Sequence, residues 1–197
     1  MTSSRTTHCH STNRCTITSS RITTGNYNIG IGSSGLGYAF NHTDLTGDHN
    51  IGIGFESGHT ISSGNNNILA GYQTGYNLTT GINSIGIGRE SLKAQTTGNK
   101  NLAIGRNALK RITTAGDSLA IGYNALQGVT TGGDNIGIGG DAGYNITTGT
   151  RNIGIGNGVF GSSGTAFTGT HNIGLGSWTT GDALTSGGYN MLMGHYA

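Results

Sequence analysis

Apolar residues recur along the chain in short alternating runs, and no segment carries an apolar stripe at helical spacing. The clearest run is Asn-Ile-Gly-Ile-Gly, and the last glycines of its copies are separated by six consecutive gaps of equal length, which define a 17-residue period. Alternation is typical of a β-strand, because successive side chains of a strand point to opposite faces. The copies end at Gly32, Gly54, Gly71, Gly88, Gly105, Gly122, Gly139, Gly156, Gly176 and Gly194.

A second β-branched run follows each of the first at a fixed phase. It reads Leu78-Thr79-Thr80-Gly81 in one unit and Val129-Thr130-Thr131-Gly132 in another. Short β-rich runs bounded by turn residues predict strands, so we expect two short strands per repeat. A unit of this length is too small to fold alone, but stacked units can bury one continuous apolar column. The pattern therefore predicts an all-β protein, a parallel β-solenoid or β-roll.

The two faces of the repeated strand differ in size. Ile85 and Ile87 share one face, which we expect to be the core face. Ser84, Gly86 and Gly88 share the other face, which is almost flat and which another chain can approach closely. Two further copies of the chain, packed around a three-fold axis, would fit such a face.

The repeat divides the chain into a leader and an array. Residues 1–20 are rich in Ser and Thr, and we expect them to be disordered or to attach the protein to a neighbour. The array spans residues 21–197, with insertions near residues 38–49 and 161–168. Insertions in a solenoid become loops on one edge and often carry binding. The candidate platforms for a sugar ring or a protein partner are Tyr38 and Phe40 in the first insertion and Trp178 after the second. The aromatic residues of both insertions, Phe160 and Phe167 included, fit equally well a structural role, in which they plug the ends of the solenoid or fill widened rungs.

Composition excludes several classes. The chain has 39 Gly but no Pro and no Gly at every third position, which excludes collagen. No apolar run approaches the ~20 residues of a membrane-spanning helix, and no apolar segment of a secretory signal follows Met1. The net charge is only +2, which argues against nucleic acid as a partner.

Basic residues are concentrated in one stretch. Six of the ten lie between residues 89 and 111. Stacking at the period of the repeat places Arg89 over Arg106, with Tyr72 and Tyr123 extending the column on either side. Such a ladder suits an anionic polysaccharide or a phosphate, because Arg offers a planar fork of donors and Tyr a stacking surface. A solvated ladder that keeps a Gly-rich fibre soluble explains the same residues and is the favoured interpretation.

Two further clusters have chemical potential. Glu56 and Glu90 share one phase two units apart, or about 9.6 Å, near the upper limit for the carboxylates of an inverting glycosidase. His8 and His10, with Cys9 and Cys15 nearby, are the candidate metal ligands. A disulfide between the cysteines is a further possibility in an oxidising compartment, and a leader that is disordered or attached to a neighbouring protein is the favoured interpretation. No other cofactor is indicated, and we expect the chain not to be an enzyme.

Columns of Thr and Asn also follow from the period. The Thr-Thr pairs raise the hypothesis of ice binding, but adjacent residues of a strand face opposite ways, so each face receives only one Thr column. Hydrogen bonding between stacked threonines is the better interpretation. The Asn column predicts an amide ladder at a turn and comprises Asn28, Asn50, Asn67, Asn101, Asn135, Asn152, Asn172 and Asn190.

The repeat resembles a known family. The units at residues 101–109 (Asn-Leu-Ala-Ile-Gly-Arg-Asn-Ala-Leu) and 118–126 (Ser-Leu-Ala-Ile-Gly-Tyr-Asn-Ala-Leu), each followed by a Thr-Thr pair, resemble the repeats of phage and viral tail-fibre proteins. Those repeats are similar to the head repeat of YadA-type trimeric autotransporter adhesins. The resemblance implies a left-handed parallel β-roll, a homotrimer, and an extracellular fibre, spike or adhesin on a virion or cell surface.

Together these observations predict a non-enzymatic structural or adhesive fibre protein. Its expected partners are further copies of itself, a surface glycan or other receptor, and a neighbouring virion or surface protein. The alternatives are a purely structural filament or capsid component, an ice-binding solenoid, and a polysaccharide depolymerase.

Overall fold

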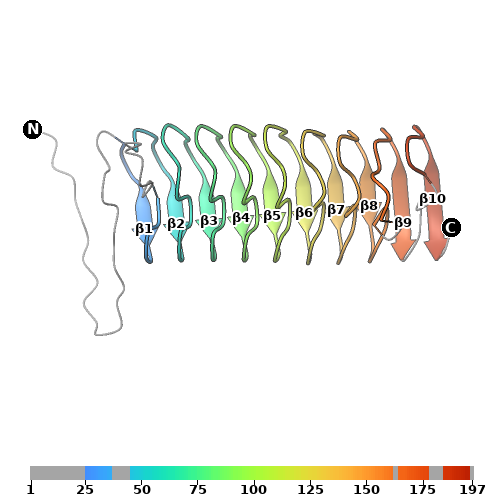
Figure 1. The fold of residues 1–197 in the computed structure, drawn as a ribbon, viewed down its shortest axis with the longest axis horizontal. Coiled ribbons are helices and arrows are strands. Elements are labelled where there is room, and N and C mark those ends of the chain that lie inside the picture. Colours follow the sequence, from blue (N-terminus) through green and yellow to red (C-terminus); the bar gives the residue numbers. More distant parts are fainter. Residues whose placement is uncertain (1–24, 37–44, 162–163, 178–183, 196–197) are drawn as a thin grey trace, which may run out of the picture.

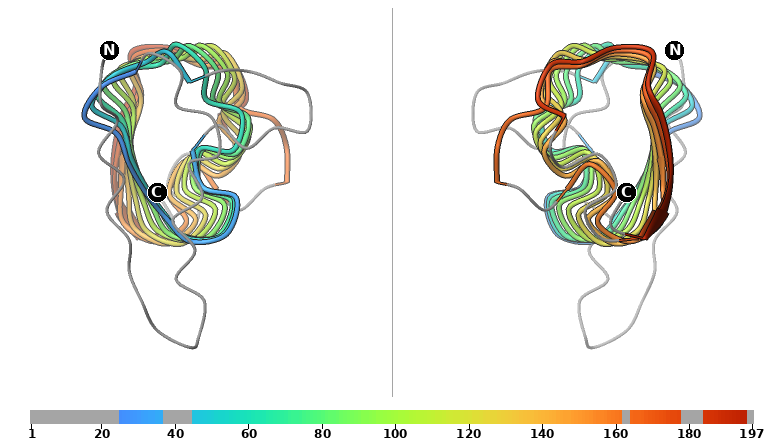
Figure 2. Two further views of the ribbon diagram at one scale, coloured as in Figure 1. Left: turned by 90° about the vertical axis from the view of Figure 1, so that its left-hand side faces the viewer. Right: turned by 90° about the vertical axis from the view of Figure 1, so that its right-hand side faces the viewer.

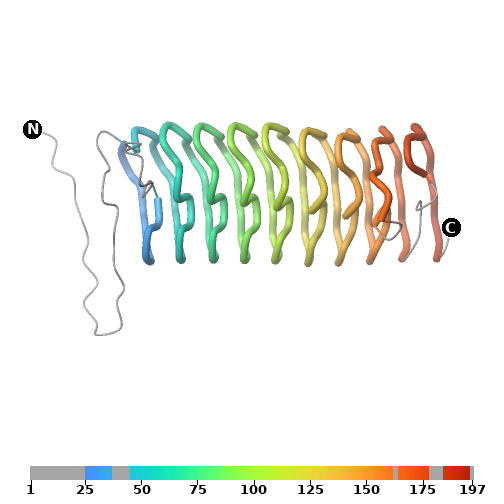
Figure 3. Tube along the Cα trace, in the orientation of Figure 1, coloured from blue at the N-terminus to red at the C-terminus, as the bar shows by residue number. Residues whose placement is uncertain are grey.

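The computed structural model describes residues 25–36, 45–161, 164–177 and 184–195. Over these residues the chain winds into a β-solenoid with no helix, and ten parallel strands stack along its length in the order of the sequence (Figure 1; Figure 3). This architecture confirms the predicted all-β parallel solenoid. The strands are β1 (Ile29–Ile31), β2 (Ile51–Ile53), β3 (Ile68–Ala70), β4 (Ile85–Ile87), β5 (Leu102–Ile104), β6 (Leu119–Ile121), β7 (Ile136–Ile138), β8 (Ile153–Ile155), β9 (Ile173–Ser177) and β10 (Met191–His195).

The strand register follows the sequence period. From β2 to β8 each residue pairs with the residue 17 positions later, as Ile85 does with Leu102. The two insertions appear as longer gaps between β1 and β2, where Ile29 pairs with Ile51, and between β8 and β9, where Ile153 pairs with Ile173. The last gap is one residue longer than the period, because Ile173 on β9 pairs with Met191 on β10. Additional residues therefore leave the sheet undisturbed. Residues 37–44, which hold most of the first insertion, lie outside the described residues.

The expectation of two strands per repeat is wrong, because each described turn contributes one strand to the sheet. The Thr-Thr segment stacks on its neighbours without forming a β-ladder. The backbone N–H groups of Thr79, Thr80 and Gly81 all donate to one carbonyl, that of Thr96, at 3.0, 3.3 and 3.4 Å. A strand would distribute these donors over alternating partners, whereas here the chain turns within the segment.

The assignment of the two strand faces is also wrong. Ile87 is 41% exposed and Ile85 is partly exposed, whereas Gly86 between them is buried. The small residues line the interior because the coil is narrow. A Cβ added to Gly86 would lie 2.7 Å from Thr74 Cγ2 and 3.2 Å from Leu92 Cδ1. The Gly face is therefore the core face, and it is not available to another chain.

Large and small side chains alternate between facing walls of this core. Where β3 places Leu69 inward, the opposite wall has Gly75, and a Cβ added there would lie 2.8 Å from Leu69 Cδ2. Where β7 places Gly137 inward, Leu126 fills the space, with Cγ 2.7 Å from the position of an added Cβ. The summed volume of each rung is thus kept roughly constant, as dense packing requires.

The predicted Asn ladder is present, and it holds the rungs together. The side chain of Asn67 donates to Asn50 Oδ1 at 3.0 Å and to the carbonyl of Gly81 at 2.9 Å. The backbone N–H of Asn67 also donates to Asn50 Oδ1, at 3.1 Å. Asn50 and Asn67 are both fully buried, so each amide satisfies backbone groups that water does not reach.

Serine replaces asparagine at two positions of this ladder. At the first, a core residue supplies the hydrogen bond that the missing asparagine would have donated. Ser84 has no amide to donate to Gly98, and Gln95, fully buried in the apolar interior, donates to both the Gly98 carbonyl and Ser84 Oγ. At the second serine, Ser118, the corresponding carbonyl of Gly132 accepts from Asn135 Nδ2 at 3.3 Å. The polar residue in the core is thus explained by the serine beside it.

Candidate binding surfaces of the solenoid

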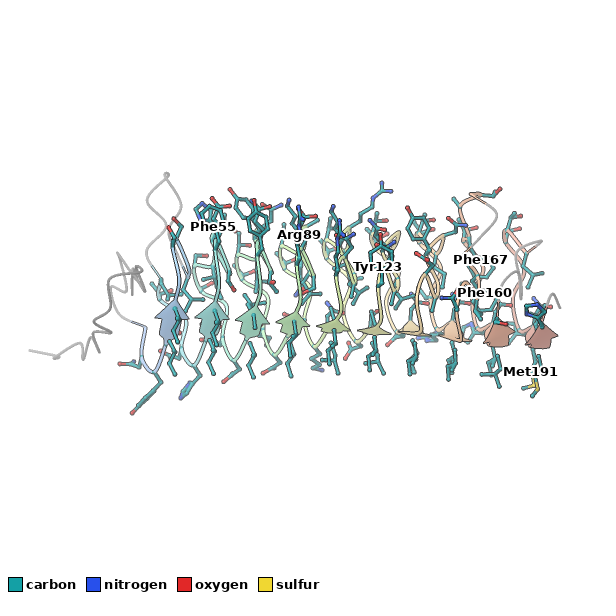
Figure 4. All side chains as sticks on the ribbon, turned by 90° about the horizontal axis from the view of Figure 1, so that it is seen from below. Phe55, Arg89, Tyr123, Phe160, Phe167 and Met191 are labelled. Carbon is teal, nitrogen blue, oxygen red and sulfur yellow. The ribbon has the colours of Figure 1, made fainter. Side chains whose placement is uncertain are left out.

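The predicted site residues Tyr72, Arg89, Arg106 and Tyr123 do lie in one column, directly after the strands. Phe55 begins the column and stacks on Tyr72, with ring centroids 5.3 Å apart and planes 12° from parallel. The guanidinium carbon of Arg89 lies 5.4 Å from the Tyr72 ring centroid, and that of Arg106 lies 5.8 Å from the Tyr123 ring centroid. We call these five residues the aromatic–arginine column. Figure 4 shows Phe55, Arg89 and Tyr123 on the side away from the outer face of the sheet.

The lysines of the basic stretch are paired with acids. Lys93 Nζ and Lys110 Nζ lie 3.0 and 2.7 Å from the carboxylate of Glu90. Lys100 Nζ lies 3.8 Å from Asp117 Oδ1, in an exposed pair. Because Lys93 and Lys110 share the single carboxylate of Glu90, these pairs offset only part of the positive charge of the three lysines.

The arginines of the stretch are not paired in this way. Among the described residues, Arg89, Arg106 and Arg111 make no ion pair. Arg89 and Arg106 occupy successive rungs, about 4.8 Å apart, and each leans on an aromatic ring rather than on an acid. Two adjacent cations without counter-charges leave this column able to attract an anion.

The two glutamates proposed as a glycosidase pair are held in a network of polar contacts. Gln73 Nε2 donates to Glu56 Oε2 at 2.6 Å, and Lys93 donates to Gln73 Oε1 at 2.7 Å. Hydrogen bonds from Lys110 and Lys93 lower the pKa of Glu90 to about 2. A general acid needs its pKa raised toward neutrality, so this carboxylate is poorly suited to that role.

Several candidate residues lie outside the described residues. They are Tyr38, Phe40 and Trp178, together with the candidate metal ligands His8 and His10 and the neighbouring Cys9 and Cys15. Within the described ranges, no three His, Cys, Asp or Glu side chains are grouped as metal ligands. Nor does this part of the chain contain a helix of the length and apolarity needed to cross a membrane.

The Thr columns have a structural role. The Thr79 hydroxyl donates to the Thr96 carbonyl at 3.1 Å, and the Thr96 hydroxyl donates to the Thr113 carbonyl at 3.2 Å. The second Thr of each pair, such as Thr97, is exposed and forms a single column. The predicted hydrogen bonding is present, with the next rung's backbone as its acceptor.

The aromatic residues that flank the second insertion point inward. Phe160 and Phe167 are both 2% exposed and stack with ring centroids 5.1 Å apart and planes 16° from parallel. Phe167 also forms a parallel bridge with Ile146. Of the two interpretations, these rings therefore fit the filling of a widened rung.

A cavity of about 340 Å³ lies beside this insertion. Sequence reasoning missed it because its walls come from three successive rungs and from the inserted residues. A signal was present, since Gly128 interrupts the side chains of one column between Arg111 and Asn145. The lining residues are Arg111, Gln127, Gly128, Tyr144, Asn145, Thr147, Gly164 and Ala166.

The outward face of the sheet is apolar on every rung. Each strand directs two side chains outward from its first and third positions, and all twenty are Ile, Leu, Met or Ala. Nine of them are at least 36% exposed. Met191 on β10 projects from this face in Figure 4. We call these residues the outer sheet face; they are Ile29, Ile31, Ile51, Ile53, Ile68, Ala70, Ile85, Ile87, Leu102, Ile104, Leu119, Ile121, Ile136, Ile138, Ile153, Ile155, Ile173, Leu175, Met191 and Met193.

Comparison with known proteins found no matching family model, no matching curated protein and no matching solved structure. The fold defines the class of the chain, a parallel β-solenoid of 17-residue turns.

Proposed function

We propose that the protein is a protomer of a homotrimeric, non-enzymatic fibre or spike, exposed outside the cell on a virion or cell surface. Three copies would pack through the outer sheet face and direct the opposite side of each coil toward a receptor. The observation that carries this proposal is the uninterrupted apolar character of the outer sheet face over ten strands.

An apolar face of a parallel sheet is normally buried against another element or another chain. Parallel sheets occur almost only with both faces buried, and their strands are then apolar on both sides. Here the coil interior covers the inner face, and no described residue covers the outer one, whose Ile53, Ile87 and Ile155 are 40–42% exposed. A second copy of the same chain offers a matching surface, because the same 17-residue register repeats on every copy.

The area of the outer sheet face can be worked out from the strand geometry. Nine spacings of about 4.8 Å and a strand length of about 10 Å for three residues give roughly 430 Å² in projection. This lies within the range of about 300–600 Å² for the largest apolar patches on monomers, which are often functional. Each copy in a ring of three contacts two neighbours, and association would withdraw the whole patch from water. The tail-fibre and adhesin resemblance favours three copies over two.

The receptor side follows from the same arrangement. With the outer sheet face buried, the aromatic–arginine column remains exposed on the far side of the coil (Figure 4). Its Arg89 and Arg106, which make no ion pair with another described residue and are flanked by Tyr72 and Tyr123, suit an anionic glycan. We therefore place receptor attachment on this side.

The proposal is tested by the mass of the full chain in solution, measured by native mass spectrometry or light scattering. We expect three times 20.1 kDa for the natural sequence. The double variant Ile87→Lys/Ile121→Lys places two charges on the outer sheet face without entering the core and should yield a folded monomer. Thr97→Lys/Thr131→Lys adds the same charges at exposed positions elsewhere and should remain a trimer.

Two results would overturn the proposal. A stable 20.1 kDa monomer of the natural sequence at micromolar concentration would show that the outer sheet face does not assemble. Open-ended polymers would indicate end-to-end stacking of coils and therefore a filament subunit.

A further inference from the structure

We propose that the cavity beside the second insertion binds an acidic monosaccharide unit, a pyranose that carries a carboxylate. This inference rests on the proposed function, since it names the chemistry of the receptor that the fibre would attach to. The volume, about 340 Å³, lies at the lower end of the range for small-molecule sites, which suits a short glycan unit rather than a long stretch of chain.

The fold brings the lining residues together by stacking. Residues one period apart lie over one another, so Arg111, Gly128 and Asn145 follow one another along one wall of the cavity. A Cβ at Gly128 would collide with the Tyr144 carbonyl, so the close stacking of rungs requires glycine here. Gly164 and Ala166 of the insertion form the far wall.

Two nitrogen donors in this space lack acceptors. The Asn145 side chain is 9% exposed, and its amide nitrogen is buried with no hydrogen-bond partner among the described residues. Leaving such a donor unpaired costs about 1–3 kcal/mol, so a ligand oxygen that reached this buried nitrogen would be favoured. Arg111 is exposed and, within the described residues, makes no ion pair. A guanidinium and an amide donor together select a ligand with a carboxylate and further acceptor oxygens.

An aromatic surface completes the site. Tyr144 lines the cavity and is 37% exposed, which leaves its ring available for stacking on the apolar face of a sugar. Gln127 adds an amide that can donate to or accept from sugar hydroxyls, and the Thr147 hydroxyl, which donates to the Phe167 carbonyl at 3.5 Å, can accept from them. A bare inorganic anion would leave these groups and the ring unused, so the arrangement favours an acidic sugar over sulfate or phosphate.

The position of the cavity is compatible with assembly. Figure 2 shows the orange bulge after β8 on the side of the coil opposite the strands. A trimer packed through the outer sheet face would therefore leave the cavity open to solvent.

The test uses the full chain and measures binding of three probes by isothermal titration calorimetry: methyl glucuronide, its neutral counterpart methyl glucoside, and sodium sulfate. Arg111→Met removes the charge and the guanidinium donors and keeps an unbranched apolar stem. Ala166→Trp fills the cavity from its exposed wall without entering the core. Arg151→Met is the matched control. Arg151 is exposed and lies in a different part of the repeat, where its Nε is 3.8 Å from Asp134 Oδ2.

We expect the natural chain and Arg151→Met to bind methyl glucuronide with equal affinity. Arg111→Met should weaken that affinity about tenfold or more, because a charge-assisted hydrogen bond is lost, and Ala166→Trp should abolish binding. Equal binding of methyl glucoside, or of sulfate, would overturn the assignment of an acidic sugar, and no binding of methyl glucuronide would overturn the site itself. The solution mass of each sample separates these results from a failure of the fibre proposal: an intact trimer without binding refutes the site alone.

Discussion

Removal of one rung of the Asn ladder should cost a large part of the stability that the ladder supplies, and Asn135 is the position at which this can be measured. Asn135 is fully buried, and its Nδ2 donates to the Gly149 carbonyl at 2.8 Å. Its Oδ1 accepts from the backbone N–H and the side-chain amide of Asn152, at 3.0 and 3.1 Å.

Asn135→Ala leaves three buried backbone groups without these partners, the Gly149 and Gly132 carbonyls and the Asn152 N–H. At about 1–3 kcal/mol for each unsatisfied buried group, we expect a loss of about 3 kcal/mol or more in the free energy of unfolding. Asn135→Ser should lose about two thirds of this, again from the same principle, because one of the three groups keeps a partner. The chain itself provides the precedent, since Ser118 Oγ accepts from the backbone N–H of Asn135 at 3.3 Å.

Urea denaturation followed by far-ultraviolet circular dichroism measures these differences. Asn77→Ala is the matched control, because Asn77 is exposed and should change the free energy by less than about 0.5 kcal/mol. The reasoning is refuted if Asn135→Ala changes the free energy of unfolding no more than this control does, or if Asn135→Ser is as costly as Asn135→Ala.

Two other substitutions test polar groups elsewhere in the coil. The double variant Ser84→Asn/Gln95→Leu restores the amide donor to Gly98 and removes Gln95 Oε1, which is buried with no hydrogen-bond partner among the described residues. In urea denaturation it should be more stable than the natural chain by about 1–3 kcal/mol, and additive effects of the two single changes would contradict the compensation. Glu90 has a folded pKa of about 2, below its ordinary 4.5, so its stabilising effect is present above pH 4.5 and is lost as the pH falls toward 2. When the pH falls from 7 to 3, the free energy of unfolding of Glu90→Gln should therefore drop by about 1 kcal/mol less than that of the natural chain, after allowance for solvent screening. Equal drops in the two proteins would show that Lys110 and Lys93 do not hold this carboxylate ionised.

The sequence period was sufficient to predict the stacking of residues. The column of Tyr72, Arg89, Arg106 and Tyr123 and the Asn ladder both follow from the 17-residue spacing, because a fixed period in a solenoid fixes which side chains are neighbours. The position of residues along the coil was therefore accessible without coordinates.

The direction in which side chains point was not accessible in the same way. Alternation shows that Ile87 and Gly86 occupy opposite faces, but it does not show which face is inside. The width of the coil decides this, and that width depends on how the chain turns after each strand. Once Gly75 is seen to face Leu69, the exchange of large and small residues identifies the inner face, but the sequence does not show which columns face each other.

The fixed rise of each turn makes the coil a molecular ruler. The two insertions fall between β1 and β2 and between β8 and β9, so seven strand spacings, or about 34 Å, separate them along the axis. Gain or loss of one whole repeat would change this distance by about 4.8 Å while the cross-section stayed the same. A chain of this design can therefore change its reach in equal steps during evolution, through duplication or deletion of a 17-residue unit, without redesigning its core.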